Sequence, residues 1–468
     1  MHGLAIAGVI MAAAAFDAVG QENKDLERIP QIEPAQPSAV EANAAQSQTS
    51  RSGKLYVEDA LMLSARRSDL VVPAPPPVPA SWQNRASADV LKQWDLAQGL
   101  SATFSDRFNL YLQNEVDFPS RQSFRNDFRE GYVTWEPRTG NYLEAGRVNV
   151  KNGVALGFNP TDFFKTRTLV DQSSLDPSVI RQNRLGTVMA RGQAIWQGGS
   201  ASLSLAPKLD SPAPISTTSP PSLSPSFDRT NGANRALVTA SYDMADLNPQ
   251  ALVYNESGRT KFGLNLSHQF GQSVVGYAEW AGGKQPNLIA QAVSYGKLTG
   301  TLPPNAPTLP PADAAEKFRH DLAVGGSWTS ETRITLNVEY HYHQAGFSRH
   351  DWRNWFDIGA ANAASQPVTG ELWYVRGFAS AQQQPLTRHQ AFVRADWPDA
   401  FVVHLELTAI AFVNLYDGST LSQLAASYDV SDAWTLRAYL SGNIGGGRSE
   451  RGSFPQAASV ILQAVRYF

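Results

Sequence analysis

Polar and apolar residues alternate one by one in several segments of this chain. From Arg333 to Gln344, the odd positions are polar or charged and the even positions are aliphatic or aromatic until the final residue. Successive side chains of a strand point to opposite faces, whereas a helix would spread both kinds around its circumference. The segment therefore predicts a strand with one polar and one apolar face. Similar alternation recurs in Arg107–Phe118, Lys261–Phe270, Arg388–Trp397 and Phe401–Tyr416.

The lengths of these segments and of their links indicate a barrel that crosses a membrane. Each segment spans about ten residues, the length that a tilted strand needs to cross a bilayer. Short links such as Pro398–Asp399 tend to alternate with long ones, as expected when turns lie at one end of a barrel and loops at the other. Tyrosines and tryptophans near the predicted strand ends, Trp135 and Trp328 among them, are typical of aromatic girdles. The longest links are Lys151–Asn183, Lys208–Asn234, Gly283–Lys317 and Ala345–Thr387.

Composition removes several other classes of protein. The chain has 468 residues, of which 42% are hydrophobic and 17% are charged, and its formal net charge is −3. This near-neutral balance argues against a nucleic-acid partner, which would favour a basic face. The chain has no cysteine, so disulfides, thiol catalysis and cysteine-bound metals are excluded. No apolar run of about 18 residues follows the N-terminus, so helical membrane spans are not expected.

The N-terminal part of the chain predicts export and a flexible extension. Leu4–Phe16 is apolar and Ala18-Val19-Gly20 follows it, which resembles a secretory signal peptide covering residues 1–20. Residues 21–80 are expected to form a mostly disordered periplasmic extension on which a periplasmic partner could bind. Within it we predict a short helix at Val57–Arg67 and a stiff spacer at Pro73–Pro79. The barrel itself is expected to span residues 81–468.

The C-terminal nine residues, Val460–Phe468, end in an aromatic residue and again alternate. They resemble the C-terminal signal of bacterial outer-membrane β-barrels, with Phe468 as the residue that the barrel-assembly machinery recognises. That resemblance implies a protein in the outer membrane, surrounded by lipid. Arg466 departs from the pattern, because a hydrophobic residue is usual at that position.

The predicted fold is all-β, a transmembrane antiparallel β-barrel of about 18 strands. The links define 17 strands between Ala97 and Phe468 when one strand is placed inside Ala345–Thr387. Both ends of such a barrel should lie in the periplasm, which requires an even number. We expect the eighteenth strand inside Ser81–Leu96, and 16 strands is the alternative.

The segment Gly146–Phe164 has the most distinctive local sequence, with Asn159-Pro160-Thr161-Asp162 as a turn signal. It resembles a segment of large outer-membrane porins and of alginate-export-type barrels. The charged link that continues it is expected to fold into the lumen and to narrow it. The residues that we predict at the narrowest point of this constriction loop are Asp162, Lys165, Arg167 and Arg181.

The polar faces of the strands should line the lumen if the apolar faces meet lipid. His341 and His343 could hold zinc together with Glu339, but they are also simply alternate polar positions of one strand. Ser348, His350 and Asn354 match the residue types of outer-membrane hydrolases without a recognisable motif. We therefore expect no catalytic residue, cofactor or metal. The predicted pore-lining residues are Arg107, Glu115, Asp117, Lys261, Arg333, Glu339, His341, His343, Arg388, Arg394, Asp396, His404, Glu406 and Arg437.

These features favour a porin-like channel for the passive passage of hydrophilic solutes, with selectivity set by lumen charges and the inward loop. One alternative is an exporter of a secreted anionic polysaccharide, which the family resemblance permits. A second alternative is an outer-membrane hydrolase or a plugged structural barrel.

Overall fold

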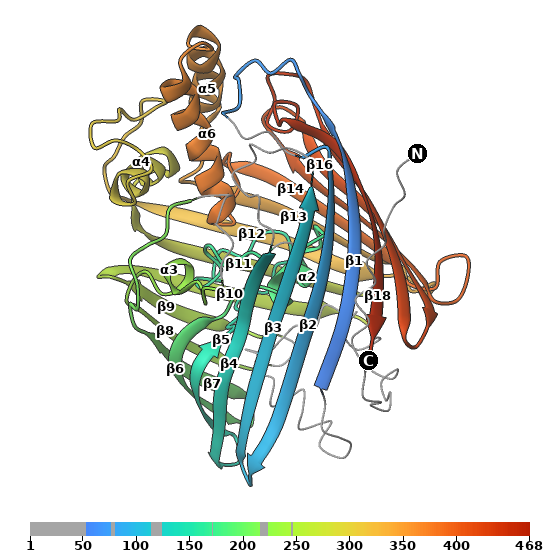
Figure 1. Cartoon of the computed structure of the whole chain (residues 1–468). Helices are drawn as coiled ribbons and strands as arrows, with labels where there is room; N and C mark the ends of the chain where they lie inside the picture. The colour runs from blue at the N-terminus through green and yellow to red at the C-terminus, as the bar shows by residue number, and fades with distance from the viewer. Residues whose placement is uncertain (1–52, 76–79, 114–123, 171, 216–222, 245–246) are drawn as a thin grey trace.

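The computed structural model describes residues 53–75, 80–113, 124–170, 172–215, 223–244 and 247–468. Within them, eighteen antiparallel strands form one sheet that closes where β18 (Gln456–Tyr467) pairs with β1 (Gly53–Arg66) (Figure 1). Each other strand pairs with its neighbours in sequence. These strands are β2 (Trp82–Ala97), β3 (Leu100–Gln113), β4 (Phe124–Arg138), β5 (Asn141–Val148), β6 (Thr187–Trp196), β7 (Gly199–Ala206), β8 (Arg235–Tyr242), β9 (Gln250–Glu256), β10 (Arg259–Phe270), β11 (Val274–Gln285), β12 (Lys317–Thr329), β13 (Thr335–His343), β14 (His389–Trp397), β15 (Leu405–Asn414), β16 (Thr420–Ser431) and β17 (Trp434–Ile444).

The helices lie in links that leave the sheet at one end, here called the helical end; the opposite end, with its short links, is the turn end. None of the helices in the described ranges is long and apolar enough to cross a membrane. The helices are α2 (Pro177–Gln182), α3 (Phe227–Thr230), α4 (Leu288–Leu298), α5 (Arg349–Ala361) and α6 (Gln366–Ala381).

Strand β13 shows how the closed sheet sorts its side chains. Val338 is 49% exposed and points outward, whereas Asn337 and Glu339 beside it are 0% and 2% exposed. The same alternation places large apolar side chains outward on the neighbouring strands. Closure satisfies every strand edge without water, so a ring with an apolar outer face is suited to lipid. Exposed tryptophans lie near the strand ends at Trp82, Trp94, Trp135, Trp196, Trp328 and Trp434.

The predicted start of the barrel at Ser81 is wrong, because β1 begins at Gly53. The predicted helix at Val57–Arg67 is wrong for the same reason, since this segment pairs with both β18 and β2. Leu61 and Leu63 point outward and Ala60 inward, so they belong to two faces of a strand. Pro73–Pro75 lie in the β1–β2 link at the helical end; residues 1–52 and the rest of the predicted spacer lie outside the described residues.

The expected count of eighteen strands is right, but one of its members differs. A strand is present inside Ser81–Leu96 as β2, whereas Ala345–Thr387 holds α5 and α6 instead of a strand. Helix α5 starts with a capping box between Ser348 and Asp351, and Trp352, Trp355 and Phe356 share its buried face. In the count of eighteen, β1 therefore replaces the strand that we expected inside Ala345–Thr387.

Candidate functional site

The link between β5 and β6, residues 149–186, crosses the interior of the barrel. At its far side, Arg394 of β14 donates from Nε to Asp176 at 2.9 Å. Leu175 donates its backbone N–H to Gln423 of β16 at 2.7 Å. Because β14 is nine strands from β5 in a ring of eighteen, the link reaches the opposite wall. Figure 1 shows α2, which belongs to this link, within the ring of strands.

The carboxylate of Glu279 on β11 anchors the first half of this link. It is fully buried and accepts hydrogen bonds from the backbone N–H groups of Val154 (3.0 Å), Ala155 (3.1 Å) and Thr161 (2.7 Å). The hydroxyl of Thr161 adds a fourth bond at 2.8 Å. Hydrogen bonds to a buried carboxylate are stronger than neutral ones, so Glu279 holds the link against the wall.

A second wall carboxylate continues this anchorage. Glu339 on β13 accepts from the backbone N–H groups of Leu156 (2.6 Å) and Gly157 (2.9 Å) and from the Tyr277 hydroxyl (2.7 Å). The backbone of the link lies so close to β14 at this point that only glycine fits, because a Cβ at Gly157 would lie 2.5 Å from the ring of Phe392. Four consecutive backbone N–H groups, those of residues 154–157, thus bind two carboxylates on different strands.

The four predicted constriction residues lie in this link, but not all of them face open space. Asp162 is 1% exposed and binds Arg184 through both oxygens, at 2.6 and 3.0 Å. Lys165 is buried and donates to the Asn159 carbonyl at 2.6 Å. Of the four predicted residues, only Arg167 and Arg181 keep exposed surface.

An ion-pair network covers the inner wall from β1 to β4. Arg107 binds Glu58 of β1, and Arg85 of β2 binds the same carboxylate at 2.7 Å. Asp89 approaches Arg107 at 3.6 Å and also binds Arg129 of β4. Arg107 was predicted in the wall, but its partner Glu58 was missed because β1 was assigned to the extension.

The predicted pore-lining residues, Arg107 included, fall into four groups. Arg333 and His404 lie in turns at the turn end and are exposed, so their assignment to the wall is wrong; Arg388 lies just before β14. Glu115 and Asp117 are outside the described residues. The residues that alternate inward on their strands are Arg107, Lys261, Glu339, His341, His343, Arg394, Asp396, Glu406 and Arg437.

Each histidine of β13 is paired with a carboxylate. His341 Nε2 lies 2.7 Å from Glu339, and His343 Nδ1 lies 2.7 Å from Asp321 of β12. Across the described ranges, no group of three or more His, Asp or Glu side chains is arranged to hold a metal ion. Ser348 caps α5, and its hydroxyl donates a hydrogen bond to Asp351 at 2.6 Å and not to His350.

The most important site residue that sequence reasoning missed is Glu279. Its only signal is a single acidic residue at an inward position of a strand that has no other charged residue before Lys284. The function of that carboxylate depends on the link folding back onto β11, and nothing in the local sequence specifies such a long-range contact.

Helices α4, α5 and α6 form a helical cap with its own apolar core. Trp355, Phe356 and Leu372 are fully buried there, and Val72 of the β1–β2 link packs with them. The cap also contacts the interior link, because Arg167 donates its backbone N–H to the Ala381 carbonyl at 2.8 Å. The guanidinium of Arg167 also bonds the Tyr295 hydroxyl of α4.

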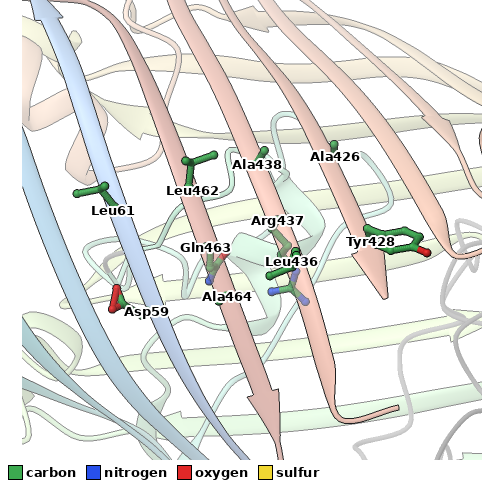
Figure 2. A pocket seen from close by; sticks show the side chains of 10 residues that line it. All are labelled: Asp59, Leu61, Ala426, Tyr428, Leu436, Arg437, Ala438, Leu462, Gln463 and Ala464. Atoms are coloured by element: carbon green, nitrogen blue, oxygen red, sulfur yellow. The ribbon is translucent and has the colours of Figure 1, made fainter. Parts of the chain in front are cut away.

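A shallow apolar concavity of about 590 Å³ lies on the outer surface, across β16, β17, β18 and β1 (Figure 2). Its lining includes the outward-facing Leu61, Tyr428, Leu436 and Leu462. The lining also includes Arg437 and Gln463, whose positions alternate inward on β17 and β18.

No family model matches the chain, and no curated protein matches it. Solved structures with a similar fold include bacterial porins. A mutant of Rhodopseudomonas blastica porin shares 9% identity at a TM-score of 0.39, covering 90% of this chain and 100% of the porin. OmpF of Salmonella typhi, in a structure described as a complex with daunomycin, shares 8% identity at a TM-score of 0.40, with 89% and 98% covered. This likeness concerns the architecture of the barrel alone.

Proposed function

We propose that the protein is a porin-like channel that lets hydrophilic solutes cross a bacterial outer membrane passively, and that the β5–β6 link sets its selectivity. One observation carries the proposal: a link held by Glu279 and Glu339 crosses the interior from β5 to the opposite wall. Such a link narrows a water-filled lumen at a fixed place. Charges and hydrogen-bonding groups beside a narrow passage decide which solutes pass.

The chemistry of the two surfaces supports the same proposal. The outer face is apolar, as lipid requires, whereas the inner wall carries paired charges such as Arg107 and Glu58. A covalent reaction would need a nucleophile beside a base, and the one serine–histidine–asparagine set singled out in the sequence has its serine bound to Asp351. Transport therefore fits the interior better than catalysis.

Single-channel conductance in planar bilayers tests this function. The native protein should conduct, and deletion of Thr161–Asp176 should raise its conductance and weaken its discrimination between ions. The double variant Glu279→Gln/Glu339→Gln keeps the whole link but weakens its anchors, so it should show larger current fluctuations. Arg259→Gln is the control, because this exposed residue pairs with Glu316 away from the link. Unchanged conductance and selectivity after the deletion would refute the constriction.

A further inference from the structure

Four arginines gather where the interior link meets α3 and β8; we call them the arginine cluster. They are Arg147 of β5, Arg167 of the link, Arg229 of α3 and Arg235 of β8. Arg229 Nε donates to the Arg167 carbonyl at 3.0 Å. Arg147 reaches Thr230, the neighbour of Arg229, at 3.4 Å.

No member of the arginine cluster forms an ion pair with a carboxylate in the described part of the chain. The guanidinium of Arg147 binds the carbonyls of Gly186 and Pro225, and that of Arg229 binds the carbonyls of Arg167 and Leu169. By contrast, Arg184 elsewhere in the same link has its own carboxylate, Asp162.

Arg235 is the member with the fewest interactions. It is 3% exposed, and none of its three guanidinium nitrogens has a hydrogen-bond acceptor among the described residues. Its guanidinium carbon lies 5.9 Å from the ring centre of Phe164. A buried cation without a carboxylate or hydrogen-bond partner is costly, so a site that retains one is suited to a negative ligand.

The charges around the cluster do not balance. Four carboxylates lie near it: Asp228 precedes Arg229 in α3, Glu256 is the cross-strand neighbour of Arg235, and Asp127 of β4 and Asp106 of β3 act on Arg147. Asp127 is already paired with Arg125 at 2.9 Å. Glu256 accepts a hydrogen bond from Tyr254 at 2.7 Å. When Arg125 is counted with the cluster, five arginines face four carboxylates, which leaves an excess of one positive charge. Burial and neighbouring arginines lower the pKa of Arg229 to about 10, so it still carries its charge at neutral pH.

We propose that the arginine cluster binds an oxyanion-bearing solute, one with several carboxylate or phosphate groups, and that the solute is reached through Arg167 and Arg229. These two side chains keep part of their surface exposed. Arg147 and Arg235 are buried, and they attract the anion through the electrostatic field of their charges. Guanidinium groups recognise both kinds of oxyanion through paired N–H donors. The inference rests on the proposed channel, because it assigns the cluster to the solute path.

Isothermal titration calorimetry with tripolyphosphate tests the site on the full chain in detergent micelles. The native protein should bind the probe. The double variant Arg167→Gln/Arg229→Gln should bind about tenfold more weakly or worse, which corresponds to the loss of about 1.4 kcal/mol or more. Arg167→Lys/Arg229→Lys keeps both charges but loses the paired N–H donors, so its affinity should lie between those of the native protein and the glutamine variant. Arg259→Gln, an arginine at the same end with a carboxylate partner, should not change binding.

Three results would overturn the arginine site: no binding by the native protein, equal binding by the glutamine variant, or equal losses in the lysine and glutamine variants. The last result would mean that the side-chain geometry matters and the charge does not. Bilayer conductance of the same samples separates this proposal from the channel itself. A protein that binds tripolyphosphate but passes no current refutes the channel and leaves the anion site standing.

Discussion

Val338 and Val274 point outward at different depths of the barrel wall. Val338 lies in the middle of β13, whereas Val274 is the first residue of β11 and pairs with Trp328 near the rim. Arginine near the bilayer midplane costs about 2–4 kcal/mol and close to the interface about 0–1 kcal/mol. Val338→Arg should therefore destabilise the barrel more than Val274→Arg. Urea unfolding in lipid vesicles, followed by tryptophan fluorescence, measures both. Equal losses of stability in the two variants would contradict the position of Val338 near the middle of the membrane and its outward orientation.

Glu371 makes the stability of the helical cap depend on pH. Burial raises the pKa of this α6 carboxyl to about 7, although its oxygen accepts a bond from the Leu309 N–H at 3.1 Å. A raised pKa means that the folded cap prefers the protonated form, so this stability is present below the unfolded pKa near 4.5 and is lost as pH rises to about 7. The loss should be on the order of 2 kcal/mol.

Hydrogen exchange of the α6 amides at pH 5 and pH 8 measures this effect after correction for the intrinsic rates. Native α6 should be better protected at pH 5, and Glu371→Gln should remove most of the difference. Glu331→Gln is the matched control, because this exposed carboxyl lies in a turn outside the cap. A pH dependence that persists in Glu371→Gln would assign it to another group.

At the level of elements, Arg376 joins α6 to the link between β17 and β18. Its guanidinium lies 4.5 Å from the ring centres of both Trp373 and Phe454. It also donates to the Ser453 hydroxyl at 2.8 Å and to the Glu450 carbonyl at 2.7 Å. Arg376→Ala removes aromatic packing and charge-assisted bonds together, so the cap should lose about 2–3 kcal/mol. Hydrogen exchange of α5 and α6 should report this as lost protection.

Arg353→Ala is the control for the aromatic contact. Arg353 lies on α5 but is exposed, and a surface substitution of this kind costs no more than about 0.5 kcal/mol. If both alanine variants left the protection of α5 and α6 unchanged, Arg376 would not be a connection between the cap and the barrel.

The elements also show what the sequence could predict. Strict alternation identified strands such as β13, because a two-residue period specifies two faces without further information. Alternation did not identify β1 as a strand. Its inward residues include the apolar Ala60 as well as Glu58, and a proline-rich stretch follows it closely. The inward course of the β5–β6 link was expected from its charge. Its true anchors, Glu279 and Glu339, depend on contacts across more than a hundred residues, which no local pattern encodes.

Arg466 is another residue whose structural role could not be predicted from the sequence. A hydrophobic residue is usual at this position of a terminal strand. The side chain of Arg466 faces outward, near the rim of the barrel. Its guanidinium lies 5.4 Å from the ring centre of Trp434 and 5.0 Å from that of Phe468. An arginine can extend to water there while its stem covers apolar surface. The role of Phe468 as an assembly signal stays a prediction.

At the scale of the whole molecule, closure depends on β1. This strand is antiparallel to both β18 and β2, so those two neighbours run parallel to each other. Without β1, the remaining seventeen strands could close only by a parallel pairing that no neighbouring strands of the described ring use. Unpaired edges cost several kcal/mol per backbone group in lipid. Removal of Glu58 would also leave Arg85 and Arg107 without their shared carboxylate.

Deletion of Gly53–Arg66 should therefore abolish folding, whereas a chain that starts at Gly53 keeps all eighteen strands and should still fold. Cold and heated samples on SDS gels distinguish the outcomes, because a closed barrel resists the detergent until it is heated and migrates differently from the unfolded chain. The chain that starts at Gly53 should show this shift and the deletion variant should not. A heat-dependent shift in the deletion variant would mean that seventeen strands can close, and the pairing of β1 with β18 would then be dispensable.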